Sequence, residues 1–137
     1  MIKKGDIKNE KTISIVIITF IMMFLIGCTK SSYVIISGKD NNSSTQMSMT
    51  YEQFSGYKET QIKVKDGEEV KVSVKIATAG GTLDAYIAKD NNESTAVYKG
   101  NDVKTSNFTV TLKEAGTYTI RVDGDKHTGG YLFDWGK

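Results

Sequence analysis

The stretch VKVSVKI, residues 70–76, decides the fold class. Its apolar residues occupy every second position, and lysine or serine stands between them. Successive side chains of a β-strand point to opposite faces, so this spacing predicts a strand with one buried and one solvated face. An amphipathic helix would instead place apolar residues three and four positions apart.

The same alternation recurs in FTVTL, residues 108–112, and in YTIRV, residues 118–122. No segment after residue 27 shows a helical period, and turn-forming residues separate the strands. Those turn signals lie at 66–67, 80–81, 90–92, 100–102, 114–116 and 123–130. About seven or eight short strands at even spacing predict an all-β fold, a single antiparallel β-sandwich.

The turn at Asp66-Gly67 bears on strand pairing. If the strands on its two sides are neighbours, a two-residue loop would place Ile62 and Val70 on opposite faces. A three-residue loop over 65–67 pairs Ile62 with Val70 and keeps both on one face, with Gly67 in the left-handed conformation. We expect this loop if the two strands pair.

Residues 1–27 differ from the rest of the chain. A polar, lysine-bearing start is followed by an almost wholly apolar run at 13–26, which is short for a membrane-spanning helix of roughly 20 residues and suits a secretory signal. The next residues, LIGC at 25–28, resemble the lipobox of bacterial lipoprotein precursors. The resemblance implies cleavage before Cys28 and a diacylglyceryl group on its thiol; the alternative is an uncleaved anchor with a free Cys28.

The composition divides the chain into three parts. Residues 1–27 are predicted to be a lipoprotein signal peptide with a helical apolar segment. Residues 28–46, mostly small and polar, are predicted to be a lipidated tether that is mobile at 39–46, with a short edge strand at 33–36 as the alternative to a wholly flexible segment. Residues 47–137 are predicted to form the sandwich. We expect an exported protein, held at the cell membrane by lipid and facing outside.

The charge balance argues against a nucleic-acid partner. The whole chain has a formal net charge of +2, and residues 1–27 carry four lysines, one aspartate and one glutamate. That segment therefore accounts for the whole +2, and residues 28–137 are neutral. Nucleic-acid binding usually requires a basic surface. Cys28 is the only cysteine, so the domain has no disulfide to stabilise it.

Two passages resemble the bacterial pre-peptidase C-terminal domain family. GGTLDAYIAKDNNES, residues 80–94, is similar to a segment in which a small loop leads into an Asp-x-Tyr-apolar strand. AGTYTIRVDGDKHTGGYLFDW, residues 115–135, is similar to the closing strands of these domains. The resemblance covers roughly residues 50–136. It implies a sandwich of jelly-roll type that acts as an accessory or matrix-binding module, and we expect a lipid anchor here in place of the enzyme that such domains usually accompany.

The sequence offers little for catalysis or metal binding. His127, the only histidine, lies in the glycine-rich stretch 123–130, where we expect a solvated turn residue, and no Gly-x-Ser-x-Gly elbow presents a serine. The acidic turns at 90–93 and 123–125 hold oxygen donors of the kind that calcium takes, but neither matches an EF-hand loop. We interpret them as exposed turns. The sequence therefore predicts no enzyme, no metal and no cofactor.

Aromatic residues are the remaining candidates for a binding site. Tyr86 has the opposite parity to its apolar neighbours and is expected on the outer face of its strand, where the alternative role is cross-strand pairing. Trp135 is expected in the core. We predict binding of a polysaccharide or protein through Tyr86, Asp90 in the loop 90–93 and Asp125 in the loop 123–130. The alternatives are a structural envelope lipoprotein without a specific ligand and, third, a hydrolase.

Overall fold

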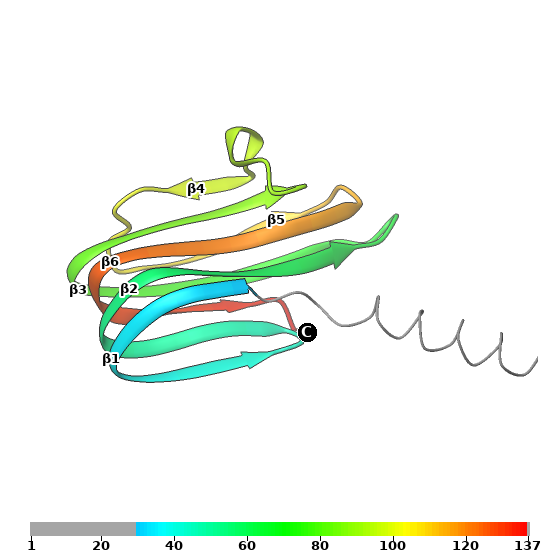
Figure 1. The fold of residues 1–137 in the computed structure, drawn as a ribbon. Coiled ribbons are helices and arrows are strands. Elements are labelled where there is room, and N and C mark those ends of the chain that lie inside the picture. Colours follow the sequence, from blue (N-terminus) through cyan, green and yellow to red (C-terminus); the bar gives the residue numbers. More distant parts are fainter. Residues whose placement is uncertain (1–29, 137) are drawn as a thin grey trace, which may run out of the picture.

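A computed structural model describes residues 30–136, which form an all-β domain (Figure 1). The predicted signal peptide and Cys28 lie outside these residues. The strands are β1 (Lys30–Ser43), β2 (Gln46–Val64), β3 (Val70–Lys89), β4 (Tyr98–Gly100), β5 (Ser106–Leu112) and β6 (Gly116–Asp134). A short 3-10 helix, η1 (Glu93–Thr95), precedes β4. Within the described part of the chain, no helix is long and apolar enough to cross a membrane.

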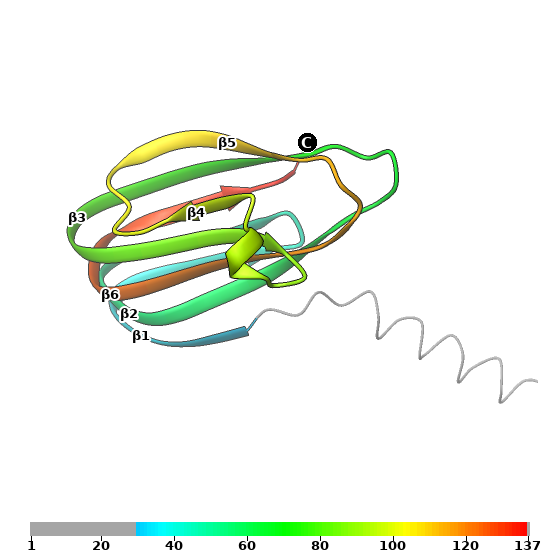
Figure 2. The ribbon, with the colours of Figure 1, turned by 90° about the horizontal axis from the view of Figure 1, so that it is seen from above.

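All six strands belong to one antiparallel sheet in the order β1-β2-β6-β3-β4, with β5 paired to β3. The long strands bend near their middles, so the sheet folds over onto itself (Figures 1 and 2). We name the two layers by their short strands. The β5 layer comprises 38–43, 46–51, 70–78, β5 and 129–134; the β4 layer comprises 30–36, 54–64, 80–89, β4 and 116–124. The predicted antiparallel β-sandwich is confirmed.

Glycine permits the bend. Gly129 has φ of 134°, and a Cβ there would lie 2.0 Å from the carbonyl oxygen of Ala77. Gly81 has φ of 67°, and its Cβ would lie 2.0 Å from the carbonyl oxygen of Lys126. Both backbones approach too closely for any side chain. The predicted turn at 80–81 and the predicted loop at 123–130 are therefore bends inside strands, and the domain has six strands instead of seven or eight.

The core lies between the two layers and follows the predicted alternation. Val72 is buried while Lys71 is exposed, so the predicted face assignment of this strand is confirmed. After the bend of β3 the buried positions change from even to odd numbers, as in Leu83 and Ile87. A register shift between Thr78 and Thr82 accounts for the change, because a β-bulge switches the parity of a strand.

The prediction of a flexible tether up to residue 46 is wrong for the described residues. Residues 30–43 form β1, which pairs with β2 from Lys30 opposite Glu59 to Ser43 opposite Gln46. The Asp40 carboxylate of β1 also accepts a hydrogen bond from the ammonium group of Lys58, which is buried between the layers. Polar composition predicted disorder, but backbone hydrogen bonding to β2 does not depend on side-chain polarity.

The two strands that flank Asp66-Gly67 are not neighbours, because β6 lies between β2 and β3. The condition for the three-residue hairpin loop is therefore not met. Gly67 does adopt the left-handed conformation, with φ of 76°, and the Glu68 amide donates a hydrogen bond to the Lys65 carbonyl at 3.0 Å. The turn is local, and it connects two strands that pair with β6 instead of with each other.

Candidate functional site

Trp135 lies at the open end of the sandwich, directly after β6. Its backbone amide donates to the Thr45 carbonyl at 2.9 Å, and its indole Nε1–H donates to the Ser44 carbonyl at 3.1 Å. Both acceptors belong to the turn between β1 and β2, so two hydrogen bonds fix the ring. Trp135 was expected in the core; it packs against the core but is only partly buried.

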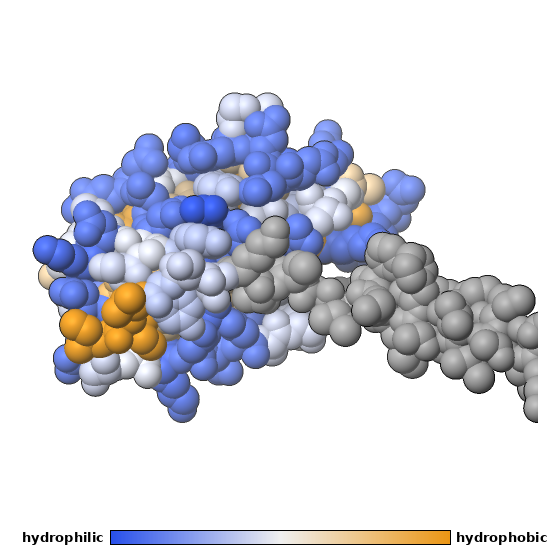
Figure 3. All heavy atoms as spheres, viewed as in Figure 1, coloured by the Kyte–Doolittle hydropathy of each residue, from blue (hydrophilic) through white to orange (hydrophobic). Residues whose placement is uncertain are grey.

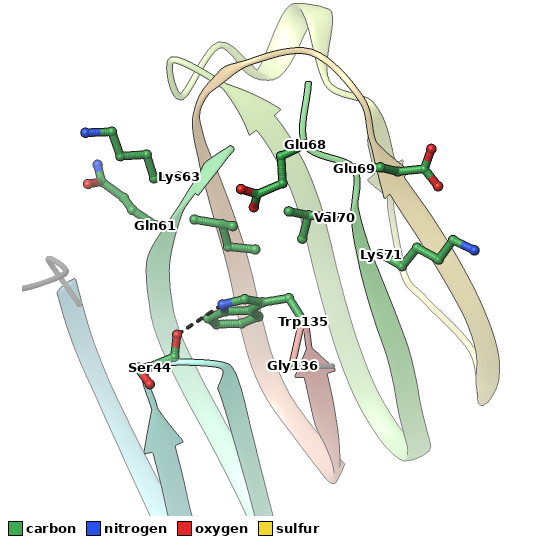
Figure 4. A pocket seen from close by; sticks show the side chains of 10 residues that line it. Ser44, Gln61, Lys63, Glu68, Glu69, Val70, Lys71, Trp135 and Gly136 are labelled. Atoms are coloured by element: carbon green, nitrogen blue, oxygen red, sulfur yellow. Dashed lines mark hydrogen bonds between the residues drawn. The ribbon is translucent and has the colours of Figure 1, made fainter. Parts of the chain in front are cut away.

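A hollow of about 510 Å³ opens beside this ring (Figure 4). It is lined by the end of β2, the start of β3, the β1–β2 turn and the residues after β6: Ser44, Gln61, Ile62, Lys63, Glu68, Glu69, Val70, Lys71, Trp135 and Gly136. Figure 4 shows Val70 and the Glu68 carboxylate above the indole ring. The lysines and Glu69 point away to the two sides. The hollow therefore combines an apolar floor with one carboxylate.

This combination suits a polyhydroxylated ligand. The face of an indole ring contacts the C–H face of a sugar ring through dispersion, and a carboxylate accepts hydrogen bonds from hydroxyl groups. Glu68 and Glu69 are adjacent, but their side chains point to different sides in Figure 4. They therefore do not flank one bond as a pair of catalytic carboxylates would. The geometry favours binding.

Tyr86, the first predicted binding residue, lies on the outer face of the β4 layer but is only 8% exposed. The parity assignment was right, whereas the prediction of an exposed ring was wrong. Its register partners are Lys99 on β4 and Arg121 on β6, and its hydroxyl donates to Asn91 Oδ1 at 2.6 Å. Burial raises the pKa of this phenol. Cross-strand pairing, the alternative role, describes these contacts.

Arg121 completes a polar network on the same face. Its guanidinium donates to both carboxylate oxygens of Asp123, each at 3.0 Å, and lies 4.2 Å from the centre of the Tyr57 ring. Glu59 lies 3.6 Å from the guanidinium. The hydrogen bonds to Asp123 are the main cause of the raised pKa of Arg121. The polar residues of this face thus contact mainly one another, and Glu59 Oε2 is buried there without a hydrogen bond to any described residue.

The structure does not bring Tyr86, Asp90 and Asp125 together. Asp90 is exposed at the turn after β3, and its amide donates to the Thr117 carbonyl at 2.9 Å. Asp125 is exposed at the bend, opposite Thr82 of β3. Thr82 and Asp90 are eight residues apart, about 26 Å along a strand. Among residues 30–136, no group of three or more histidine, cysteine or acidic residues is placed to hold a metal ion.

His127 is fully buried at the bend, so the expectation of a solvated turn residue was wrong. Thr78 Oγ1 donates to the Val103 carbonyl at 2.8 Å, which leaves its oxygen as the acceptor for His127 Nε2–H, also at 2.8 Å. The Tyr51 hydroxyl then donates to Nδ1 at 2.6 Å. These bonds fit the neutral Nε2–H tautomer, and burial lowers the pKa of the imidazole.

A signal for this burial was present in the sequence. His127 shares odd parity with Tyr131 and Phe133, which are buried on the inner face of β6. Extending their alternation backwards by four residues reaches His127. The glycines at 124, 129 and 130 instead led us to predict a loop, so the alternation was not followed back to His127. In the structure these glycines lie at the bend of β6.

Comparisons with known proteins do not identify a family. No family model matches the chain, and no curated protein matches it. A family 35 carbohydrate-binding module from Clostridium thermocellum is 13% identical, with a TM-score of 0.41 over 82% of this chain and 99% of that one. The pre-peptidase C-terminal domain of collagenase from Bacillus anthracis is 14% identical, with a TM-score of 0.37 over 80% and 86%. Similarity this weak assigns neither a family nor a ligand.

Proposed function

We propose that this protein is an exported, lipid-anchored surface module that binds a macromolecule without turning it over. The observation that carries the proposal is the fixed, partly exposed ring of Trp135, which lines the same hollow as Glu68 at one end of the sandwich. This chemistry favours a polysaccharide over a protein ligand.

Several arrangements of the described residues support a role without catalysis. His127 is buried and engaged by two hydroxyl groups, so it does not reach a substrate. Glu68 and Trp135 line the same hollow, and the neighbouring carboxylate of Glu69 points to the other side. General acid–base chemistry needs two groups that converge on one bond. Of the ionisable side chains that line the hollow, the lysines and Glu69 point away to the sides, so they do not converge with Glu68 on one bond.

Titration calorimetry tests the binding proposal. The domain without the lipid, residues 29–137, is titrated with each of a panel of purified cell-wall polysaccharides. Trp135→Ala should weaken binding at least about tenfold, as expected for a buried aromatic contact, whereas Val97→Ala at a distant exposed position should not. Unchanged affinity of the Trp135→Ala variant with an unchanged thermal midpoint would place the site elsewhere. Newly formed reducing ends during incubation would contradict the absence of turnover.

The anchor is tested separately in cells. Cys28→Ala should prevent lipid attachment and cleavage, so that a larger precursor accumulates. A variant that is processed normally and still fractionates with membranes would contradict the lipobox interpretation. A protein that is anchored but binds no polymer or protein partner would favour the structural envelope alternative.

A further inference from the structure

Two apolar side chains on β1 face solvent. Val34 is 71% exposed and Ile36 is 51% exposed. Their strand neighbours Tyr33 and Ile35 have the opposite parity and pack against the core. Among the described residues, Val97 is the one other large apolar side chain with comparable exposure, at 50%. Figure 3 shows a hydrophobic patch where β1 approaches its bend, on an otherwise largely hydrophilic face.

The patch lies on an outer edge of the sandwich. β1 is the first strand of the sheet order and pairs on one side only, with β2. Val34 and Ile36 lie in the half of β1 that precedes the bend, where Ser37 has φ of 48°. The opposite edge of this layer is β4, and Val97 lies beside it. The two exposed apolar positions of β1 and the one at Val97 therefore lie on opposite edges of the same layer.

The length of chain before β1 brings this edge close to the proposed lipid anchor. β1 begins at Lys30, so Thr29 alone separates it from Cys28. Two Cα–Cα steps span at most about 7 Å, and the four residues from Lys30 to Val34 add about 13 Å of strand. Val34 therefore lies within roughly 20 Å of the residue that would carry the lipid. A flexible tether would have removed this constraint, but residues 30–43 are a paired strand.

We propose that the β1 edge lies against the lipid bilayer, with Val34 and Ile36 in the interfacial region. The inference rests on the proposed lipid anchor at Cys28. Two exposed side chains are too few to hold a free protein on a membrane, but tethering makes their contact intramolecular and raises the effective concentration greatly. β1 contains Lys30 and Lys39 against Asp40, a formal +1, so the contact is mainly apolar and does not need anionic lipid.

The test uses the full chain, processed and lipidated in cells, and reconstituted into neutral phosphatidylcholine vesicles. Single cysteines are introduced as Val34→Cys and, as the matched control, Val97→Cys, and each is labelled with an environment-sensitive fluorophore. The parent chain should take no label, because lipid blocks its Cys28 thiol. Vesicle flotation reports anchoring independently of the label, and equal thermal midpoints exclude misfolding.

The expected result is a blue-shifted emission at position 34, quenched by nitroxide-bearing lipid, with aqueous emission at position 97. Flotation with aqueous emission at both positions would overturn the edge contact and leave the anchor intact. A blue shift at both positions would also overturn it, because the contact would not be specific to β1. Failure of the parent chain to float would overturn the anchor and this inference together. Added anionic lipid should leave the shift at position 34 unchanged.

Discussion

Mild acid should destabilise the domain through His127. The unfolded imidazole has a pKa of about 6.5. Burial lowers the pKa of His127 in the folded state. Between the two pKa values the unfolded chain therefore binds more protons than the folded chain. The contribution of the neutral imidazole to stability is therefore complete above about pH 7, and it is lost as the pH falls below about 6.5 towards the folded-state pKa. Any histidine that is buried in its neutral form lowers the stability of the folded state in acid in the same way.

The loss of stability in acid is largest if the buried imidazole takes up no proton in the folded state, and this limiting case gives an upper bound. If the folded imidazole stays neutral down to pH 5, protonation of the unfolded chain alone removes about 1.9 kcal/mol between pH 7 and pH 5. The phenol that bonds to His127 does not interfere, because burial raises the pKa of Tyr51 far above this range. Most carboxylates titrate near or below pH 4.3 when unperturbed.

The assay is urea unfolding of residues 29–137 at pH 7 and pH 5, with His127→Gln as the variant that cannot titrate. The parent should lose up to about 1.9 kcal/mol more than the variant over this range. The variant should be less stable at pH 7 by about 1 to 3 kcal/mol, because glutamine cannot reproduce both hydrogen bonds. Parallel losses in the two proteins would refute the reasoning. If the variant does not fold, an NMR titration of His127 in the parent should give a pKa below the ordinary value of about 6.5, because burial lowers it. A pKa at or above that value would contradict the reasoning.

Two substitutions test the packing of the sandwich by thermal and urea unfolding. Val72→Asp should abolish folding, because an unpaired charge in the core costs several kcal/mol against a free energy of unfolding of about 5 to 15 kcal/mol. Lys71→Asp on the exposed face should be tolerated. A more damaging Lys71→Asp would contradict the face assignment. Gly129→Ala should be strongly destabilising, because its Cβ would meet the Ala77 carbonyl. Gly80→Ala should cost far less stability, because its Cβ would lie 3.6 Å from the Thr128 hydroxyl oxygen. Equal losses of stability would show that the bend adjusts to a side chain.

The sequence by itself determined the fold class. Alternation in residues 70–76 and 118–122 depends only on which faces of a strand meet water, and that property is local. The buried faces of β3 and β6 therefore follow the predicted parity at Val72, Ile76 and Ile120. The outward parity of Tyr86 was predicted for the same reason. Its burial was not, because it depends on neighbours such as Arg121 that are distant in the chain.

Tertiary structure alone decided which segments pair and where the strands bend. Polar composition at 39–46 predicted mobility, yet β1 extends to Ser43 because β2 offers its backbone hydrogen bonds. Glycines at 123–130 predicted a loop, yet they allow β6 to cross from one layer to the other and enclose His127. Trp135 reaches the hollow because the β1–β2 turn supplies two carbonyl acceptors. Each of these outcomes depends on contacts between segments far apart in the chain, which a local pattern of residues does not encode.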